Sequence, residues 1–311
     1  MAEQNETSEI DLLYEGNDKL EKIFGEDFVD ENQDNIELYI NGEKKELTSE
    51  YELKKGINNI KLVIKNKLEN LSFMFDECKT LKNIDGLKYL NTENCESFES
   101  LFNGCSSLTD IKALENWNVS NVTNFRGMFQ GCSSLSEIES LQNWDVKNGE
   151  DFSFMFQGCK SLTNINGLKN WNVSKGEGFD SMFEGCELLS DIRALEFWDV
   201  SNGNNFESMF LECSSLSDIK PLERWNVANG NNFMGMFSKC SSLSDITPLE
   251  NWDVSNGDGF TFMFSECSSL TNIKKLQKWN VQNGQGFEDM FADCSLLKDS
   301  EINELFEKWK I

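Results

Sequence analysis

The sequence predicts an α/β fold, a single capped solenoid in which every coil of 27 residues contributes a short parallel strand and a short helix. Two periodic features carry this prediction. Nine of the ten cysteines follow one another at intervals of 27 residues, and seven tryptophans keep the same interval. The cysteines are Cys78, Cys105, Cys132, Cys159, Cys186, Cys213, Cys240, Cys267 and Cys294. The tryptophans are Trp117, Trp144, Trp171, Trp198, Trp225, Trp252 and Trp279.

The repeat unit explains why the coils have to stack. Written once, it reads C-x-S-L-x-x-I-x-x-L-x-x-W-[DN]-V-x-N-G-x-x-F-x-x-M-F-x-x. A unit this short cannot enclose a core of its own, so each coil covers its apolar residues with the coils on either side. Strands of neighbouring coils lie about 4.8 Å apart, which predicts a rod roughly 40 Å long.

The first half of a coil reads as a strand and a corner. In the coil of residues 105–131, we expect the strand at 108–112, with Ile111 pointing inward and a charged residue on each side of it pointing outward. Later coils carry a proline two residues after the equivalent isoleucine, and proline cannot donate to an inter-coil ladder, so the strand ends before it. Trp117 then begins the corner.

The second half of a coil reads as a turn and a helix. Asn-Gly pairs such as 202–203 are typical of turns with a positive φ angle. Phe125, Met128 and Phe129 recur at i, i+3 and i+4, which is one face of a short helix.

Both ends of the repeat array depart from the pattern, as expected for caps that cover exposed strand edges. Residues 1–70 predict a mainly β N-terminal cap with a hairpin at Asn41-Gly42. Residues 71–298 form the solenoid, and residues 299–311 predict a capping helix. The apolar face of that helix is formed by Ile302, Leu305, Phe306 and Trp309.

The repeat also resembles a known family. Residues 117–138, WNVSNVTNFRGMFQGCSSLSEI, are similar to BspA-like leucine-rich-repeat surface proteins of the protist type with a 27-residue repeat. The shared motifs, W-[DN]-V-S-N and M-F-x-x-C-S-S-L, recur over residues 71–297. The resemblance implies a leucine-rich-repeat-like α/β solenoid and a role in protein binding or adhesion. Most coils depart from the family by carrying Asn-Gly-x-x-Phe, whereas the coil at Val122 keeps Asn-Val-Thr-Asn.

Composition narrows the function. Lys and Arg number 28 against 54 Asp and Glu, a net charge of −26, which disfavours binding to nucleic acid and to anionic membranes. The chain has no histidine, which excludes Ser-His-Asp and Cys-His catalysis and every histidine metal ligand. The turn loops match neither a calcium-binding loop nor a phosphate loop, so we expect no metal and no cofactor.

The cysteine column predicts buried thiols that pack as small apolar groups. It contains no closely spaced pair of the kind that zinc requires. Reduced thiols indicate a reducing compartment. Cys95 lies outside the period, and we expect it to be a free thiol that is exposed.

The residue after each tryptophan alternates between Asn and Asp. Adjacent coils would place these side chains roughly 5 Å apart, where a column of carboxylates would repel itself and an intervening amide could donate to its neighbours. We therefore hypothesise a structural ladder that joins the coils; duplication of a two-coil unit is the alternative. Its members are Asn118, Asp145, Asn172, Asp199, Asn226, Asp253 and Asn280.

Two kinds of residue are candidates for partner binding. Acidic and basic side chains alternate on the solvent side of the predicted strands, where repeat proteins commonly bind, although a merely solvated face is an equal alternative. Three aromatic residues replace small or polar ones, either as contact anchors or packed under a neighbour. The candidates are Asp110, Lys112, Phe154, Asp191, Arg193, Phe197, Asp218, Lys220, Asp245 and Phe262.

Together these features predict a non-catalytic protein-interaction or structural scaffold that lies in the cytoplasm. Its partner would be a protein whose surface is basic or carries charges of both signs, or the chain would be part of a larger assembly. We expect it neither to bind nucleic acid nor to insert into a membrane. The alternative, which rests on the resemblance, is a cell-surface adhesin that binds host or matrix proteins.

Overall fold

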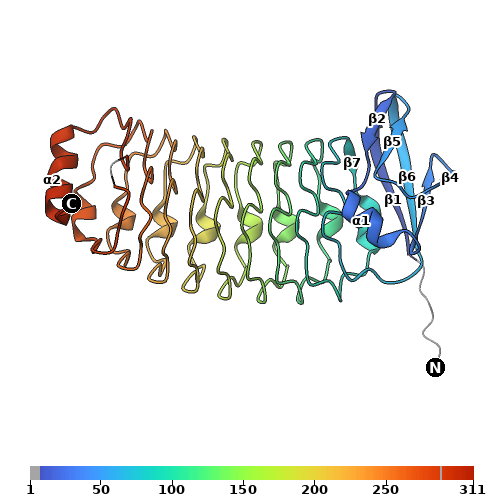
Figure 1. The fold of residues 1–311 in the computed structure, drawn as a ribbon, viewed down its shortest axis with the longest axis horizontal. Coiled ribbons are helices and arrows are strands. Elements are labelled where there is room, and N and C mark those ends of the chain that lie inside the picture. Colours follow the sequence, from blue (N-terminus) through green and yellow to red (C-terminus); the bar gives the residue numbers. More distant parts are fainter. Residues whose placement is uncertain (1–7, 288) are drawn as a thin grey trace.

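The computed structural model describes residues 8–287 and 289–311. Figure 1 shows an elongated row of stacked coils with a β-sheet at the N-terminal end and helix α2 at the other end. The structure is therefore mixed α/β with a periodic central part, which is compatible with the predicted solenoid.

The N-terminal cap is a five-stranded sheet in the order β4-β3-β6-β1-β7, with a separate β2-β5 ribbon and helix α1. Strand β1 alternates buried and exposed side chains, as a sheet with one covered face requires. The predicted hairpin forms between β3 and β4, with Asn41 and Gly42 both at positive φ. The elements are β1 Ser8–Gly16, β2 Lys19–Lys22, α1 Glu26–Asn32, β3 Ile36–Ile40, β4 Glu43–Lys45, β5 Glu50–Leu53, β6 Gly56–Ile64 and β7 Leu81–Asn83.

The cap and the first coil share both a sheet and a core. Strand β7 belongs to the first coil and pairs antiparallel with β1. The ring of Phe24 from the cap lies 6.1 Å from that of Phe75, which begins one of the aromatic columns of the coils. The first coil is thus covered by strand pairing and by apolar contact at once, which protects its open edge.

The coils are held together by columns of identical side chains. Trp144 and Trp171 stack with ring centroids 6.3 Å apart and an interplanar angle of 3°. The indole N–H of Trp171 donates to the carbonyl of Leu141 in the preceding coil at 2.9 Å, and other tryptophans repeat this bond. Parallel columns of phenylalanine run beside them, as in the stack of Phe129 on Phe156. The tryptophans and Met-Phe pairs are buried, as the repeat predicts.

Backbone pairing between coils follows the Phe-x-x-Met-Phe segment. The N–H of Phe125 donates to the carbonyl of Asp151, and that of Phe129 donates to the carbonyl of Met155, both in the next coil. Every second N–H of the segment points along the stack in this way, and the intervening ones close tight turns within the coil. All these backbone groups are therefore paired without a regular helix.

The strand and the helix predicted within each coil do not form as expected. The segment of Phe125, Met128 and Phe129, expected to be helical, forms successive turns. In the segment 108–112, expected to be a strand, residues 108–111 have no regular secondary structure and residue 112 begins a 3₁₀ helix. Instead, Ile111 has ψ 21°, which ends the extended backbone and begins a 3₁₀ helix. Among the described residues, the first coil has a strand here, β7, because the cap offers it a partner, and two later coils share a single parallel bridge between Asn164 and Asp191. The 3₁₀ helices are η1 Asp85–Tyr89, η2 Lys112–Leu114, η3 Glu139–Leu141, η4 Asn166–Leu168, η5 Arg193–Leu195, η6 Lys220–Leu222, η7 Thr247–Leu249 and η8 Lys274–Lys278.

The Asn-Gly pairs also have a different role from the one predicted. Gly203 does not adopt a positive φ. A Cβ atom at this position would lie 2.6 Å from the ring of Phe206 and 3.0 Å from the carbonyl oxygen of Val200. Glycine is required here because the phenylalanine ring packs against its backbone.

The C-terminal helix α2, Asp299–Trp309, completes the stack. Its Trp309 stacks on Trp279 at 6.3 Å, and its Phe306 lies 6.4 Å from Phe291. The helix thus supplies the aromatic rings that a further coil would have supplied. This placement agrees with the predicted apolar face of the helix.

Candidate functional site

The aspartates predicted on the solvent side of the strands lie where the 3₁₀ helices begin. A carboxylate oxygen of Asp110 accepts the backbone N–H of Lys112 at 2.7 Å, and Asp218 accepts that of Lys220 at 2.8 Å. Asp245 makes the same bond to the residue two positions on. These aspartates therefore have a local structural role, since each satisfies a helix N–H that would otherwise have no partner.

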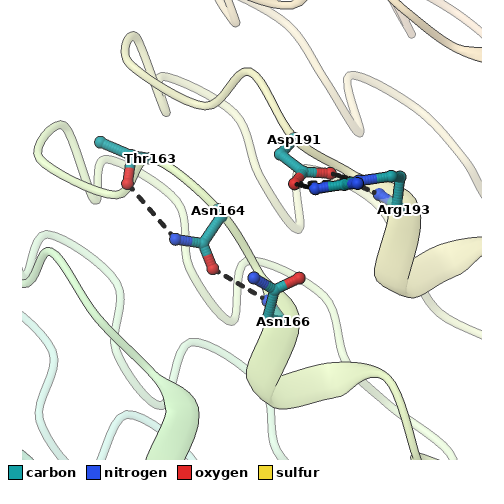
Figure 2. Close-up of polar contacts among 5 residues, drawn as sticks. All are labelled: Thr163, Asn164, Asn166, Asp191 and Arg193. Atoms are coloured by element: carbon teal, nitrogen blue, oxygen red, sulfur yellow. Dashed lines mark hydrogen bonds and ion pairs between the residues drawn. The ribbon is translucent and has the colours of Figure 1, made fainter.

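Figure 2 shows the two versions of this turn in adjacent coils. Asn164 accepts the N–H of Asn166 at 3.2 Å, whereas Asp191 accepts both the backbone and the guanidinium of Arg193. The hydrogen bonds from Arg193 lower the pKa of Asp191. The charges of this pair cancel locally, so the row of aspartates has fewer free carboxylates than its sequence suggests.

We call the side of the molecule formed by the 3₁₀ helices η2 to η7 and the residues just before and after them the 3₁₀ face. Hollows lie there between η2 and η3, between η5 and η6, and between η6 and η7. They have volumes of about 510, 390 and 420 Å³. The second is lined by three bases and three acids, Arg193, Glu196, Asp218, Lys220, Glu223 and Arg224, together with Pro221. The candidate residues Asp110, Lys112, Asp191, Arg193, Asp218, Lys220 and Asp245 all belong to the 3₁₀ face.

Phe197 is the exposed aromatic of the 3₁₀ face. Its side chain is 71% exposed, directly after Glu196 at the edge of the second hollow. The next residue, Trp198, is 4% exposed and stacks on Trp171, so the backbone that carries Phe197 is firmly held. Tyr89 has the equivalent position four coils earlier and is also exposed. Of the two alternatives left open for Phe197, an exposed side chain or one packed under a neighbour, the structure therefore shows the exposed one.

Phe154 and Phe262 lie on a different part of the coil from Phe197. Both have φ 60°, in the left-handed region, within the segment that pairs coil to coil. The guanidinium of Arg126 covers the ring of Phe154 at 4.4 Å, so this side chain is partly buried, whereas Phe262 is 44% exposed. The three predicted anchors therefore do not form one site. The contact of Arg126 with Phe154 was not predicted, although Arg126 precedes Phe154 by one coil and one residue.

The hypothesised Asn/Asp ladder is wrong in its bonding. Each member is exposed, and Asn118, Asn172, Asp199, Asn226, Asp253 and Asn280 accept an N–H from two residues later in their own coil, while Asp145 pairs with Lys147. Within the described ranges, no hydrogen bond joins one member to the next. A ladder does exist three residues further on, where the amide of Asn229 donates to the carbonyl of Ser201 in the preceding coil at 2.7 Å. The asparagine of the Asn-Gly pair makes this bond in several coils.

One carboxylate of the 3₁₀ face joins two coils electrostatically. Glu250 lies 2.8 Å from the ammonium of Lys275 and 2.6 Å from that of Lys278, both in the following coil. Hydrogen bonds from these two lysines lower the pKa of Glu250 to about 2. This cluster was not predicted from the sequence.

The cysteine column is buried, and all ten cysteines are free thiols, as predicted. The thiol of Cys132 donates to the carbonyl of Phe102 in the preceding coil at 3.2 Å, and the bond recurs along the column. Burial raises the pKa of Cys186 to about 12. The prediction that Cys95 is exposed is wrong, since its side chain is buried and its pKa is likewise raised to about 12. Such thiols are poor nucleophiles.

Within residues 8–287 and 289–311, no group of three or more Cys, Asp or Glu side chains is placed to hold a metal ion. In the same ranges, no helix has the length and apolar character needed to cross a membrane.

Comparison with known proteins gives one match. A family model described as Mycoplasma protein of unknown function, DUF285, matches residues 69–194 and again residues 189–305. The matched residues span the coils and end in the C-terminal helix. No curated protein and no solved structure matches the chain.

Proposed function

The chain belongs to the family whose model it matches, DUF285, and from that premise we propose that it is a non-catalytic protein-binding scaffold of the leucine-rich-repeat type. The repeat character of the family supports this proposal, since stacked repeats commonly present an extended surface to partner proteins. In this proposal the coils form a single solenoid, and the 3₁₀ face is the surface that contacts the partner.

The exposed phenyl ring of Phe197 carries the proposal. An aromatic side chain that is 71% exposed costs solubility, and asparagine holds the equivalent position in four other coils. Aromatic residues are enriched among the side chains that dominate binding energy. The stacked Trp198 fixes the backbone beside it, so little conformational entropy is lost on binding.

The surroundings of Phe197 indicate the chemistry of the partner. The neighbouring hollow contains both acidic and basic side chains, whereas the whole chain is strongly acidic. A partner with an apolar pocket and a basic or mixed rim would complement this face, and long-range attraction would speed its approach.

Substitution of Phe197 tests the proposal. F197N gives this coil the residue that four other coils have at this position, so it removes the anchor without altering the stack. Affinity capture from the native cell should lose a partner with F197N that both the wild-type chain and the control N170A retain. Retention of the same proteins by F197N, at unchanged amounts, would contradict the proposal.

The compartment is a separate part of the proposal. We place the chain in the cytoplasm because all ten cysteines are free thiols, which fits a reducing environment. The resemblance to BspA-like surface proteins favours the other candidate, a cell-surface adhesin. Protease treatment of intact cells separates the two, since a cytoplasmic scaffold survives it and an adhesin is cleaved.

A further inference from the structure

We propose that a second surface, on the left-handed edge of the coils, binds an extended arginine-rich segment of a partner protein. The left-handed edge consists of the residues at one repeat position between residues 73 and 262, all with φ between 51° and 62°. They are Phe73, Ser100, Gly127, Phe154, Ser181, Ser208, Gly235 and Phe262. The inference rests on the proposed role in protein binding but concerns a different face from that of Phe197.

The three phenylalanines of this edge are poorly explained by folding. A bulky residue in the left-handed region is strained, and the same repeat position holds glycine, serine or, in the last coil, aspartate elsewhere. Burial does not offset the strain at Phe262, because that side chain is 44% exposed. A side chain that costs stability and remains accessible indicates a contact with another molecule.

The charge around the edge favours a cationic partner. In each coil, we consider the three residues that lie one, three and four positions before the edge residue. Between residues 69 and 287, the only basic side chain at these positions is Arg126. The same positions hold many carboxylates. They are Glu69, Glu96, Glu99, Glu150, Asp151, Glu177, Asp180, Glu207 and Asp258. Several of these are fixed by bonds between coils, such as that from Ser153 to Asp180 at 2.6 Å, so the negative surface is already ordered.

Arg126 shows how the edge receives a guanidinium. Its guanidinium carbon lies 4.4 Å from the centroid of the Phe154 ring, and one of its nitrogens is 3.9 Å from Asp151. Arginine stacks on aromatic faces in this way and is attracted to the neighbouring carboxylate. Four coils further on, Met234 replaces Arg126 beside Phe262, so that ring has no guanidinium of its own to cover it.

Phe73 offers a second accessible ring at the other end of the edge. It lines a hollow of about 960 Å³ together with Glu69, Glu96 and Glu99, and no basic side chain lines this hollow. Coils spaced by about 4.8 Å place Phe73 roughly 14 Å from Phe154, and Phe154 roughly 19 Å from Phe262. A segment in extended conformation, with about 3.3 Å per residue, would follow this line along the stack.

Binding of short cationic peptides to the full chain tests the inference. Fluorescence anisotropy would compare a labelled oligoarginine with an oligolysine of equal length. Oligoarginine should bind more tightly, because guanidinium stacks on phenyl rings better than ammonium. The double variant F73S/F262S, with the serine found in other coils, should weaken oligoarginine binding roughly five- to twenty-fold and oligolysine binding less than about two-fold.

Two further variants separate stacking from charge. R126Q uncovers the ring of Phe154 and should strengthen oligoarginine binding more than K239Q does, although both remove one positive charge from this region. F197N should leave oligoarginine binding unchanged, because it lies on the 3₁₀ face, and its effect on partner capture tests the proposed function separately. Equal affinity for the two peptides, or unchanged oligoarginine binding by F73S/F262S, would overturn the inference.

Discussion

The C-terminal helix is expected to hold the last coils closed through a single side chain, Trp309. This residue is 9% exposed, stacks on Trp279 at 6.3 Å and donates its indole N–H to the carbonyl of Leu276 at 3.1 Å. The variant W309A removes the ring and leaves a cavity against the column, which costs about 3–5 kcal/mol. The more conservative W309F keeps much of the apolar contact but loses the hydrogen bond. That loss lowers the free energy of unfolding by about 1 kcal/mol, in addition to any loss of packing.

The loss should be local, because each coil of a stacked repeat contacts only its neighbours. Amide hydrogen exchange measures this directly. The N–H of Phe264, bonded to the carbonyl of Met290, should lose protection in W309A. The equivalent N–H of Phe156, bonded to Met182 in the middle of the stack, should keep its protection.

Two results would refute this reasoning. Equal loss of protection at Phe156 and Phe264 would mean that the coils unfold as one unit and not by fraying from the end. Unchanged protection at both, with an unchanged unfolding temperature, would mean that Trp309 does not cover the last coil in solution.

Four further outcomes are expected. Native alkylation should leave Cys186 unlabelled, because burial raises its pKa to about 12, whereas labelling after denaturation should modify all ten thiols; native labelling at neutral pH would show that the column opens. The pKa of Glu250 is lowered to about 2 in the folded chain, against about 4.3 in the unfolded chain. Its ion pairs therefore stabilise the fold fully above about pH 4.3, and this stabilisation is lost as the pH falls toward 2. E250Q should lower the unfolding temperature at pH 7 but not near pH 2. F262G should raise the free energy of unfolding by about 0.5–1 kcal/mol in chemical denaturation, because glycine relieves the left-handed strain, and a loss would show that the ring packs. N229A should lower the free energy of unfolding by about 1 kcal/mol, because it removes the inter-coil hydrogen bond. N226D should change the free energy of unfolding by less than about 0.5 kcal/mol at any pH, since aspartate can accept the same local N–H. If N226D lost stability only at neutral pH, the ladder hypothesis would be restored.

The candidate site was predictable in part. Phe197 stood out because it breaks the repeat at a position where most other coils have asparagine or a charged residue, and the structure exposes it. Phe154 and Phe262 stood out for the same reason, but sequence could not place them on another face. The inter-coil bond of Asn229 was missed, because Asn226 and Asn229 lie in one loop and only the tertiary structure shows which of them points to the preceding coil.

The sequence by itself determined the register of the stack and the identity of its core. A 27-residue period in Cys, Trp and Phe leaves apolar side chains that only the neighbouring coils can cover, so the rings of Trp171 and Trp198 pack against each other. The tertiary structure decided how the backbone runs between these anchors. Whether a segment becomes a strand, a 3₁₀ helix or a left-handed turn depends on which N–H and C=O groups face the neighbouring coil, and that is a property of residues 27 positions apart. Ile111 and Phe154 show this, since neither adopts the conformation that its local sequence predicts.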